Sequence, residues 1–243
     1  MKRAFVYIVL ATLVDGCAGM TGALVPERWL ARRRAAWVGF ATGVLLGVTF
    51  LHVLPEAVAT HSVQGVLRAT LASFTCMTAL EWWLGHRGTR RSYRAILPVM
   101  LLASDGLHNT SDGAAVAAAF LVSPRLGLLT TLAVVAHEVP KEIGDFALLT
   151  AAGMGRIRAI VALAIVQLTA GIGALAAVLL VSFWSSAEGL VLGIAAGTFL
   201  YIAATDLLPE LLHESQGGRA GHQAILAFLV GLAIALVMAR LPA

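Results

Sequence analysis

The chain has 243 residues, of which 59% are hydrophobic and only 12% are charged. Soluble domains carry about 25% charged residues, so this composition excludes an ordinary soluble globular protein. A helix that crosses the hydrocarbon core of a membrane uses roughly 20 apolar residues, and about eight such helices fit into this length with short connections.

Long apolar runs predict an all-α polytopic membrane protein that forms a single transmembrane transporter domain over residues 1–243. The strands of a membrane β-barrel would be about 10 residues long with alternating polarity, whereas these runs are continuous and about twice as long. In chain order, the eight predicted spans are residues 4–25, 35–58, 63–84, 95–121, 127–150, 157–183, 188–212 and 222–239.

The basic residues indicate how these spans are oriented. Eleven of the 17 Lys and Arg residues lie in the connections after the first, third, fifth and seventh spans, and five lie on the opposite side. Cytoplasmic loops carry the excess of Lys and Arg, so we predict that both termini lie outside. We attribute the formal net charge of +4 to this topology. The expected partner is therefore the lipid bilayer, and we expect no nucleic acid.

A short motif occurs at the ends of the second and seventh spans. Residues 52–56 are His-Val-Leu-Pro-Glu, and residues 206–210 are Asp-Leu-Leu-Pro-Glu. If spans one to three and six to eight are repeats, the two motifs have opposite orientations, as in the inverted repeats of secondary transporters. We predict a three-plus-two-plus-three arrangement, with chance recurrence of five residues as the alternative interpretation.

Charged side chains lie inside the apolar runs, where each costs about 2.5–3.5 kcal/mol on insertion scales. Lys141 is the only cation among them. The acids are Asp15, Asp105, Asp112, Glu138, Glu142, Asp145 and Asp206. Because the acids exceed their internal counter-charge by several units, protons or metal ions must share the site.

The fourth span offers three donors on one helical face. His108 and Asp112 are four residues apart, and Asn109 and Asp112 are three residues apart, so these side chains are neighbours on a helix. Imidazole and carboxylate groups suit zinc and other divalent first-row metals.

The fifth span repeats this chemistry. His137 and Lys141 share one stripe of the helix, and Glu138, Lys141 and Asp145 form an adjacent stripe. We predict a metal site where the fourth and fifth spans meet. Polar contacts that merely hold the helices together are the alternative interpretation.

At these residues the chain resembles the ZIP (Zrt-, Irt-like) family of divalent metal transporters. The family's His-Asn-x-x-Asp-Gly pattern is present at 108–113, and its His-Glu-x-Pro-His-Glu-x-Gly-Asp pattern is matched at 137–145 except at Lys141. Residues 54–56 and 197–210 also resemble the family's second and seventh spans, so the resemblance covers essentially the whole chain.

The resemblance implies transport of zinc into the cytoplasm, with Fe²⁺, Mn²⁺, Cd²⁺ and Co²⁺ as further cargoes. It implies no enzyme activity and no catalytic cofactor, and it is consistent with a homodimer in a bacterial cytoplasmic (inner) membrane. The implied metal ligands are His108, Asn109, Asp112, His137, Glu138 and Gln167.

Further residues are expected along the route of the ion. The resemblance implies such a role for His52, Glu56, Asp206 and Glu210, and we add Asp15 and Asp105. A buried hydrogen-bond acceptor is the alternative interpretation for Asp15, and an interfacial charge at a helix end is the alternative for Glu56 and Glu210.

Lys141 departs from the family pattern, which has His, Glu or Gln there, able to bridge two metals. An ammonium group has three donors and no lone pair. We expect Lys141 to pair with Glu138 or Asp145 and to take the place of a second cation. Lys141, Glu142 and Asp145 are therefore predicted to modulate the site rather than to bind the metal.

Two other functions compete with metal transport. Residues 137–141 match the His-Glu-x-x-His motif of zinc proteases except at its last position. Lys141 stands there, where the second zinc ligand is needed. The second alternative is a transporter or channel for another solute, in which the acids act as proton relays.

Overall fold

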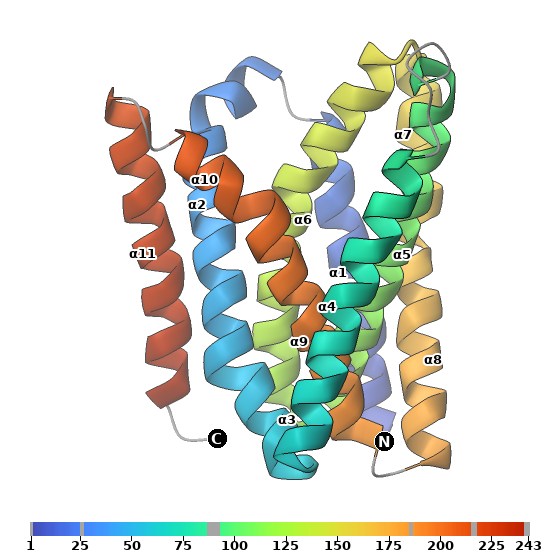
Figure 1. The fold of residues 1–243 in the computed structure, drawn as a ribbon, viewed down its shortest axis with the longest axis vertical. Coiled ribbons are helices and arrows are strands. Elements are labelled where there is room, and N and C mark those ends of the chain that lie inside the picture. Colours follow the sequence, from blue (N-terminus) through green and yellow to red (C-terminus); the bar gives the residue numbers. More distant parts are fainter. Residues whose placement is uncertain (1, 25–26, 87–92, 185–186, 215–217, 241–243) are drawn as a thin grey trace.

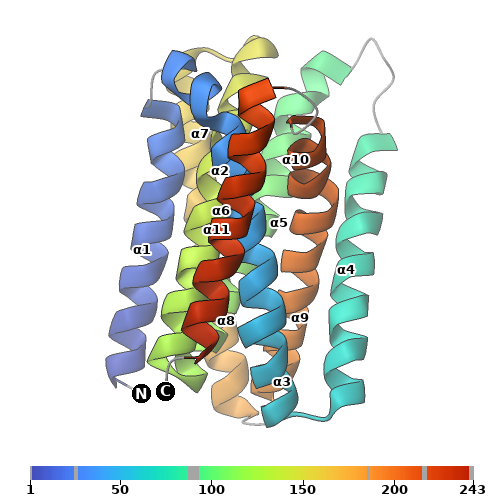
Figure 2. The same ribbon diagram turned by 90° about the vertical axis from the view of Figure 1, so that its left-hand side faces the viewer.

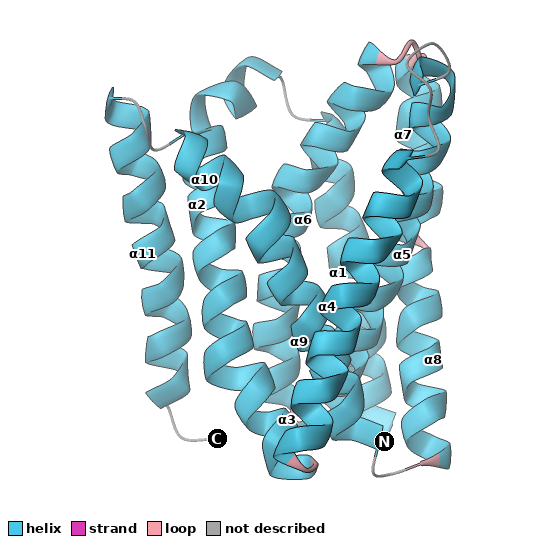
Figure 3. Ribbon diagram, viewed as in Figure 1, coloured by secondary structure: helices cyan, strands magenta, loops and turns pink. Residues whose placement is uncertain are grey.

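The computed structural model describes residues 2–24, 27–86, 93–184, 187–214 and 218–240, which are almost entirely helical (Figure 3). No β-strand occurs within these ranges. The predicted all-α fold is therefore confirmed.

The helices follow the predicted apolar runs in chain order. They are α1 (Lys2–Leu24), α2 (Glu27–Val48), η1 (Thr49–Val53), α3 (Leu54–Thr60), α4 (Val63–His86), α5 (Tyr93–Val122), α6 (Pro124–Ala151), α7 (Arg156–Gln167), α8 (Thr169–Phe183), α9 (Glu188–Ile202), η3 (Ala203–Leu207), α10 (Leu208–Glu214) and α11 (Gly218–Arg240). Most boundaries differ from the prediction by a few residues, and two differences are larger. The second helix begins at Glu27 rather than at residue 35, and the run at 157–183 is divided at Leu168.

The segments η1 and η3 are π-helical turns at matching positions. Leu54 donates its amide to the carbonyl five residues earlier, and Leu208 does the same. Each is followed by a proline, Pro55 or Pro209. Proline has no N–H, and its ring crowds the carbonyl four residues earlier. The wider turn accommodates the proline without ending the helix.

The helices stand side by side in one bundle (Figures 1 and 2). α2 packs against α11, α4 against α9, α5 against α8, and α1 against α6. α5 and α6 also contact each other. The described chain begins and ends at the same end of the bundle, and the α6–α7 connection lies at the opposite end (Figure 1).

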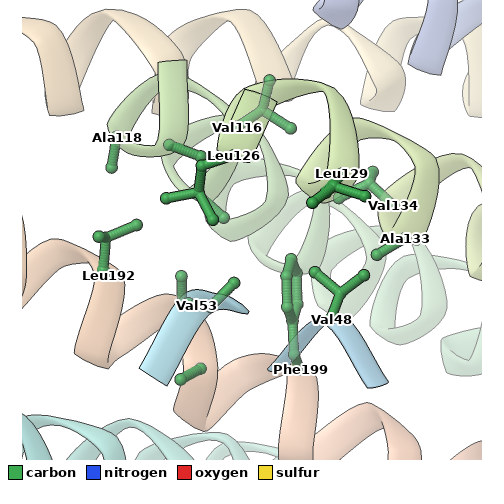
Figure 4. Close-up of a cluster of buried hydrophobic side chains, with 14 of the residues drawn as sticks. Val48, Val53, Val116, Ala118, Leu126, Leu129, Ala133, Val134, Leu192 and Phe199 are labelled. Carbon is green, nitrogen blue, oxygen red and sulfur yellow. The ribbon is translucent and has the colours of Figure 1, made fainter. Parts of the chain in front are cut away.

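A buried apolar cluster lies where α2, η1, α5, α6 and α9 meet (Figure 4). Its members include Val48, Val53, Val116, Ala118, Leu126, Leu129, Ala133, Val134, Leu192 and Phe199. Ala133 precedes His137 by one helical turn. α6 starts at the end of the bundle where the described chain begins and ends. Its cluster residues at 126–134 therefore lie between that end and His137.

Four helical segments are long and apolar enough to cross a membrane, as judged by length and composition within the described residues. They are Ala35–Thr60, Arg156–Phe183, Glu188–Thr205 and Ala220–Arg240. α1 contains a shorter apolar stretch, Ala4–Met20. α6 carries several charged residues, which lower its apolar character. The eight-span topology stays a prediction.

α5 and α8 approach each other closely at two glycines. A Cβ atom at Gly113 would overlap the carbonyl oxygen of Ala170, and a Cβ atom at Gly173 would overlap that of Thr110. Each helix therefore presents a glycine where the other helix presents its backbone, and any side chain there would push the helices apart.

We expect Gly113→Ala to destabilise the protein by about 1–3 kcal/mol, which is the usual range for overpacking. The measurement is the melting temperature of purified protein in detergent. Gly171→Ala is the control, because a Cβ at Gly171 on α8 meets nothing within 4 Å. Equal melting temperatures for the two variants would contradict the close approach.

Candidate metal site

The polar residues of α5 and α6 meet inside the bundle. On each helix every one of them has another member three to five residues away, so they project from one side. The buried members are Asp105, His108, Asn109 and Asp112 on α5, and His137, Glu138 and Glu142 on α6. The two predicted polar faces are thus turned toward each other.

Four of these residues form one compact set of metal-ligand atoms, which we call the histidine group. His108, Asp112, His137 and Glu138 place ligand atoms within 4.8 Å of one another. The Nε2 atoms of the two histidines are 3.0 Å apart. Asp112 Oδ2 lies 3.3 Å from Nε2 of His108 and 3.1 Å from Nε2 of His137. Two imidazoles and two carboxylates match the usual four ligands of zinc.

The imidazole of His137 is held by groups that the sequence analysis missed. Its Nδ1 lies 2.9 Å from the carbonyl oxygen of Ala133. A carbonyl only accepts, so Nδ1 donates and Nε2 is turned toward the other ligands. Metal-binding histidines commonly donate their second ring nitrogen in this way. The ring of Phe199 packs against the imidazole, with centroids 6.3 Å apart.

Several buried oxygens have no hydrogen-bond donor among the described residues. In the site these are Asp105 Oδ2, Asp112 Oδ1, Glu138 Oε2, Asn109 Oδ1 and Gln167 Oε1. The Asn109 amide nitrogen donates to Asp105 Oδ1 at 2.9 Å, which leaves its oxygen without a partner. Buried polar atoms almost always have a partner in native proteins. A bound cation would satisfy the lone pairs of these oxygens.

A second set of acidic oxygens lies beside the first, and we call it the acid group. Asp105, Glu138 and Glu142 place oxygens within 4.8 Å of one another. Nζ of Lys141 contacts Asp105 Oδ1 and lies 3.4 Å from Glu138 Oε1. It also lies 3.4 Å from Asp145 Oδ2. Both predicted partners are therefore beside the lysine, and Asp105, which was expected on the ion route, is a third.

The interruption between α7 and α8 brings Gln167 to the site. Its amide nitrogen donates to Glu138 Oε1 at 2.8 Å and to Glu142 Oε1 at 2.7 Å. α7 ends at Gln167, and the amide of Leu168 bonds to the carbonyl of Ile165 three residues earlier. Apart from the family resemblance, no sequence signal marks this position.

The other residues expected along the ion route are spread over the bundle. Asp15 on α1 is buried, and its Oδ1 has no partner among the described residues. His52 places Nε2 2.9 Å from the carbonyl oxygen of Ala235 on α11. Glu56 is half-buried on α3. The side chains of Asp206 and Glu210 lie outside the described part of the structure.

Comparison with known proteins finds relatives among zinc transporters. The sequence model of the family described as ZIP Zinc transporter matches residues 85–239. Zinc transporter ZIP13 of Pongo abelii is 34% identical over 247 residues, which cover 90% of this chain and 74% of that protein.

Two further relatives match over shorter regions. Zinc transporter ZIP10 of Mus musculus is 40% identical over 148 residues, or 58% of this chain. Zinc transporter ZIP4 of Homo sapiens is 44% identical over 117 residues, or 48% of this chain. The matched regions are 18% of the length of each of these two relatives.

Proposed function

This chain belongs to the ZIP family of zinc transporters, and from this membership we propose that it carries divalent metal ions, above all zinc, through the histidine group. The family is one of transporters rather than enzymes. One observation carries the proposal: α5 and α6 bury two imidazoles and two carboxylates together, with oxygens that have no donor among the described residues. Fe²⁺, Mn²⁺, Cd²⁺ and Co²⁺ accept the same ligands and are proposed as further cargoes.

The proposed ligands are more numerous than zinc needs at one time. They are His108, Asn109, Asp112, His137, Glu138 and Gln167. Zinc is four-coordinate in most protein sites. The histidine group supplies those four ligands, and the amide oxygens of Asn109 and Gln167 replace them as the ion moves. Exchange of this kind lets the ion leave without a covalent step.

We propose the eight-span, three-plus-two-plus-three inverted repeat as the architecture around this site. The π-helical turns η1 and η3 precede the matching sequences at 54–56 and 208–210, which supports the repeat. The packing supports it too. In this repeat, span one corresponds to span six, two to seven, three to eight, and four to five. The contact of α2 (span two) with α11 (span eight) then corresponds to that of α9 (span seven) with α4 (span three). Likewise, the contact of α1 (span one) with α6 (span five) corresponds to that of α8 (span six) with α5 (span four).

The proposed direction of transport is toward the cytoplasm. By the positive-inside rule we assign the end with Arg156 and Arg158, at the start of α7, to the cytoplasm, with both termini outside. The apolar cluster drawn in Figure 4 includes Leu126, Leu129 and Val134, which lie on α6 between its start at the outer end and His137. Glu142 and the partly exposed Asp145 lie one and two turns beyond Glu138 toward the cytoplasmic end. An ion that leaves the histidine group in this direction therefore meets further acids.

The protein is a multi-pass membrane protein, as its family and its four apolar segments indicate. The relatives described above come from animals, so they give the bacterial inner membrane no support as its location. That location and the homodimer stay predictions of the sequence. Light scattering of the purified protein in detergent measures the oligomeric state, with two chains per particle expected.

Zinc uptake into proteoliposomes tests the proposed function. Vesicles that hold a zinc-sensitive dye are expected to brighten when zinc is added outside, and protein-free vesicles are the control. The rate is expected to saturate with zinc concentration, because a site of fixed capacity carries the ion. Cleavage of a membrane peptide without zinc uptake would contradict transport and favour the protease alternative.

A further inference from the structure

The histidine group and the acid group share one carboxylate. Glu138 Oε2 is turned to the histidine group, where it lies 3.7 Å from Nε2 of His108 and 4.0 Å from Nε2 of His137. Glu138 Oε1 is turned the other way and accepts the amide of Gln167 at 2.8 Å. One side chain thus faces two places where buried ligand atoms could surround a cation.

The second of these places already contains a positive charge. Nζ of Lys141 contacts Asp105 Oδ1 and lies 3.4 Å from both Glu138 Oε1 and Asp145 Oδ2. The lysine therefore contacts two of the three acids of the acid group, and Asp145 beside them. Its side chain is only 18% exposed, so its charge is partly withdrawn from water and balanced by these acids.

An ammonium group and a metal ion cannot share the acid group. The ammonium has three N–H donors and no lone pair, so it repels a divalent ion and cannot ligate one. Its three N–H groups match the three acids around it. A divalent ion among Asp105, Glu138 and Glu142 would have to displace the lysine from these partners.

We propose that Lys141 is a built-in counter-ion that fills the second cation position, so that this transporter holds one divalent ion per chain, in the histidine group. This inference rests on the proposed function, since it assigns the number of ions at the same site. It also gives Lys141 a positioning role. Together with Gln167 it holds Glu138 Oε1, which leaves Oε2 free for the metal.

Zinc titration of the purified full chain in detergent tests this inference. Bound zinc is measured by elemental analysis after equilibrium dialysis, and affinity by calorimetry. The wild-type chain is expected to bind one zinc ion tightly. Lys141→Glu is expected to bind two, because it replaces the ammonium with a ligand. Lys141→Arg keeps the charge and is the matched control, with one ion expected.

A double variant locates the second ion. Asp105 belongs to the acid group only, so adding Asp105→Asn to Lys141→Glu is expected to return the stoichiometry from two zinc ions to one. If Lys141→Glu does not fold, Lys141→His serves in its place, because imidazole is also a zinc ligand and adds no negative charge.

The outcomes separate the inference from the proposed function. Two tight ions in the wild-type chain would overturn the inference and leave the function intact. One ion in the wild type and still one in a folded Lys141→Glu or Lys141→His variant would also overturn it. No tight zinc in the wild-type chain would instead contradict the proposed function itself.

Discussion

Glu138→Gln is expected to reduce zinc uptake into proteoliposomes to the level of protein-free vesicles, a loss of at least about 100-fold. Changing only the outer partners of a metal ligand already costs about 10–100-fold, and this change removes a ligand. Glu138 is buried, faces both cation positions and is held by Gln167 and Lys141. The amide of glutamine keeps the shape but loses the charge and one of the two acceptor oxygens.

Glu188→Gln is the matched control for this experiment. Glu188 is a half-buried acid at the start of α9, at the opposite side of the apolar cluster from the histidine group. The same chemical change there is expected to leave uptake within about twofold of wild type. Uptake by a folded Glu138→Gln variant at the wild-type rate would show that the ion does not pass this carboxylate.

Asp112→Asn is expected to weaken zinc binding by about 100-fold, on the same argument about ligand removal. Asp112 Oδ2 lies within 3.3 Å of Nε2 of both histidines, and Oδ1 has no donor among the described residues. The measurement is the stabilisation that zinc gives against heat. At zinc 100-fold above the wild-type Kd, the wild type gains about 2.7 kcal/mol, whereas a variant with a 100-fold higher Kd gains only about 0.4 kcal/mol.

Asp145→Asn is the control for Asp112→Asn. Asp145 lies on α6, and its Oδ2 lies 3.4 Å from Nζ of Lys141. Its zinc-dependent stabilisation is expected to fall much less than that of Asp112→Asn, because Asp145 is predicted to modulate the site rather than to bind the metal. An equal loss in both variants would indicate that the overall negative charge of the site binds zinc, rather than the geometry of the histidine group.

Much of the fold was predictable because the apolar runs are long and the connections are short. Each predicted run corresponds to helix in the described residues, and the spacing of His108 and Asp112 places them on one face as expected. The π-helical turns were not predicted. The repeated Leu-Pro-Glu motif marked their positions, but local sequence does not indicate whether proline ends, bends or widens a helix.

The contacts between helices were less predictable than the helices themselves. Asp105 was expected along the ion route, yet its carboxylate contacts Lys141 on the neighbouring helix. That contact depends on the position of α5 along the axis of α6. The spacing of residues within one helix does not predict this position. The same reason explains why the contact of His137 with Phe199 of α9 was missed.

Gln167 illustrates a different limit. It lies in an apolar run whose pattern predicts one unbroken helix, and the interruption after it turns its amide toward Glu138 and Glu142. Only the resemblance to a family indicated this residue in advance. Tertiary contacts, such as the bond from Thr169 Oγ1 to the carbonyl of Gly106, accompany the interruption.

Anomalous diffraction at the zinc edge, from crystals grown with zinc, would locate the ion most directly. We expect one strong peak per chain, about 2.0–2.2 Å from ligand nitrogen or oxygen atoms of His108, Asp112, His137 and Glu138. A strong peak elsewhere in the bundle, with these four side chains bound to no ion, would contradict the account.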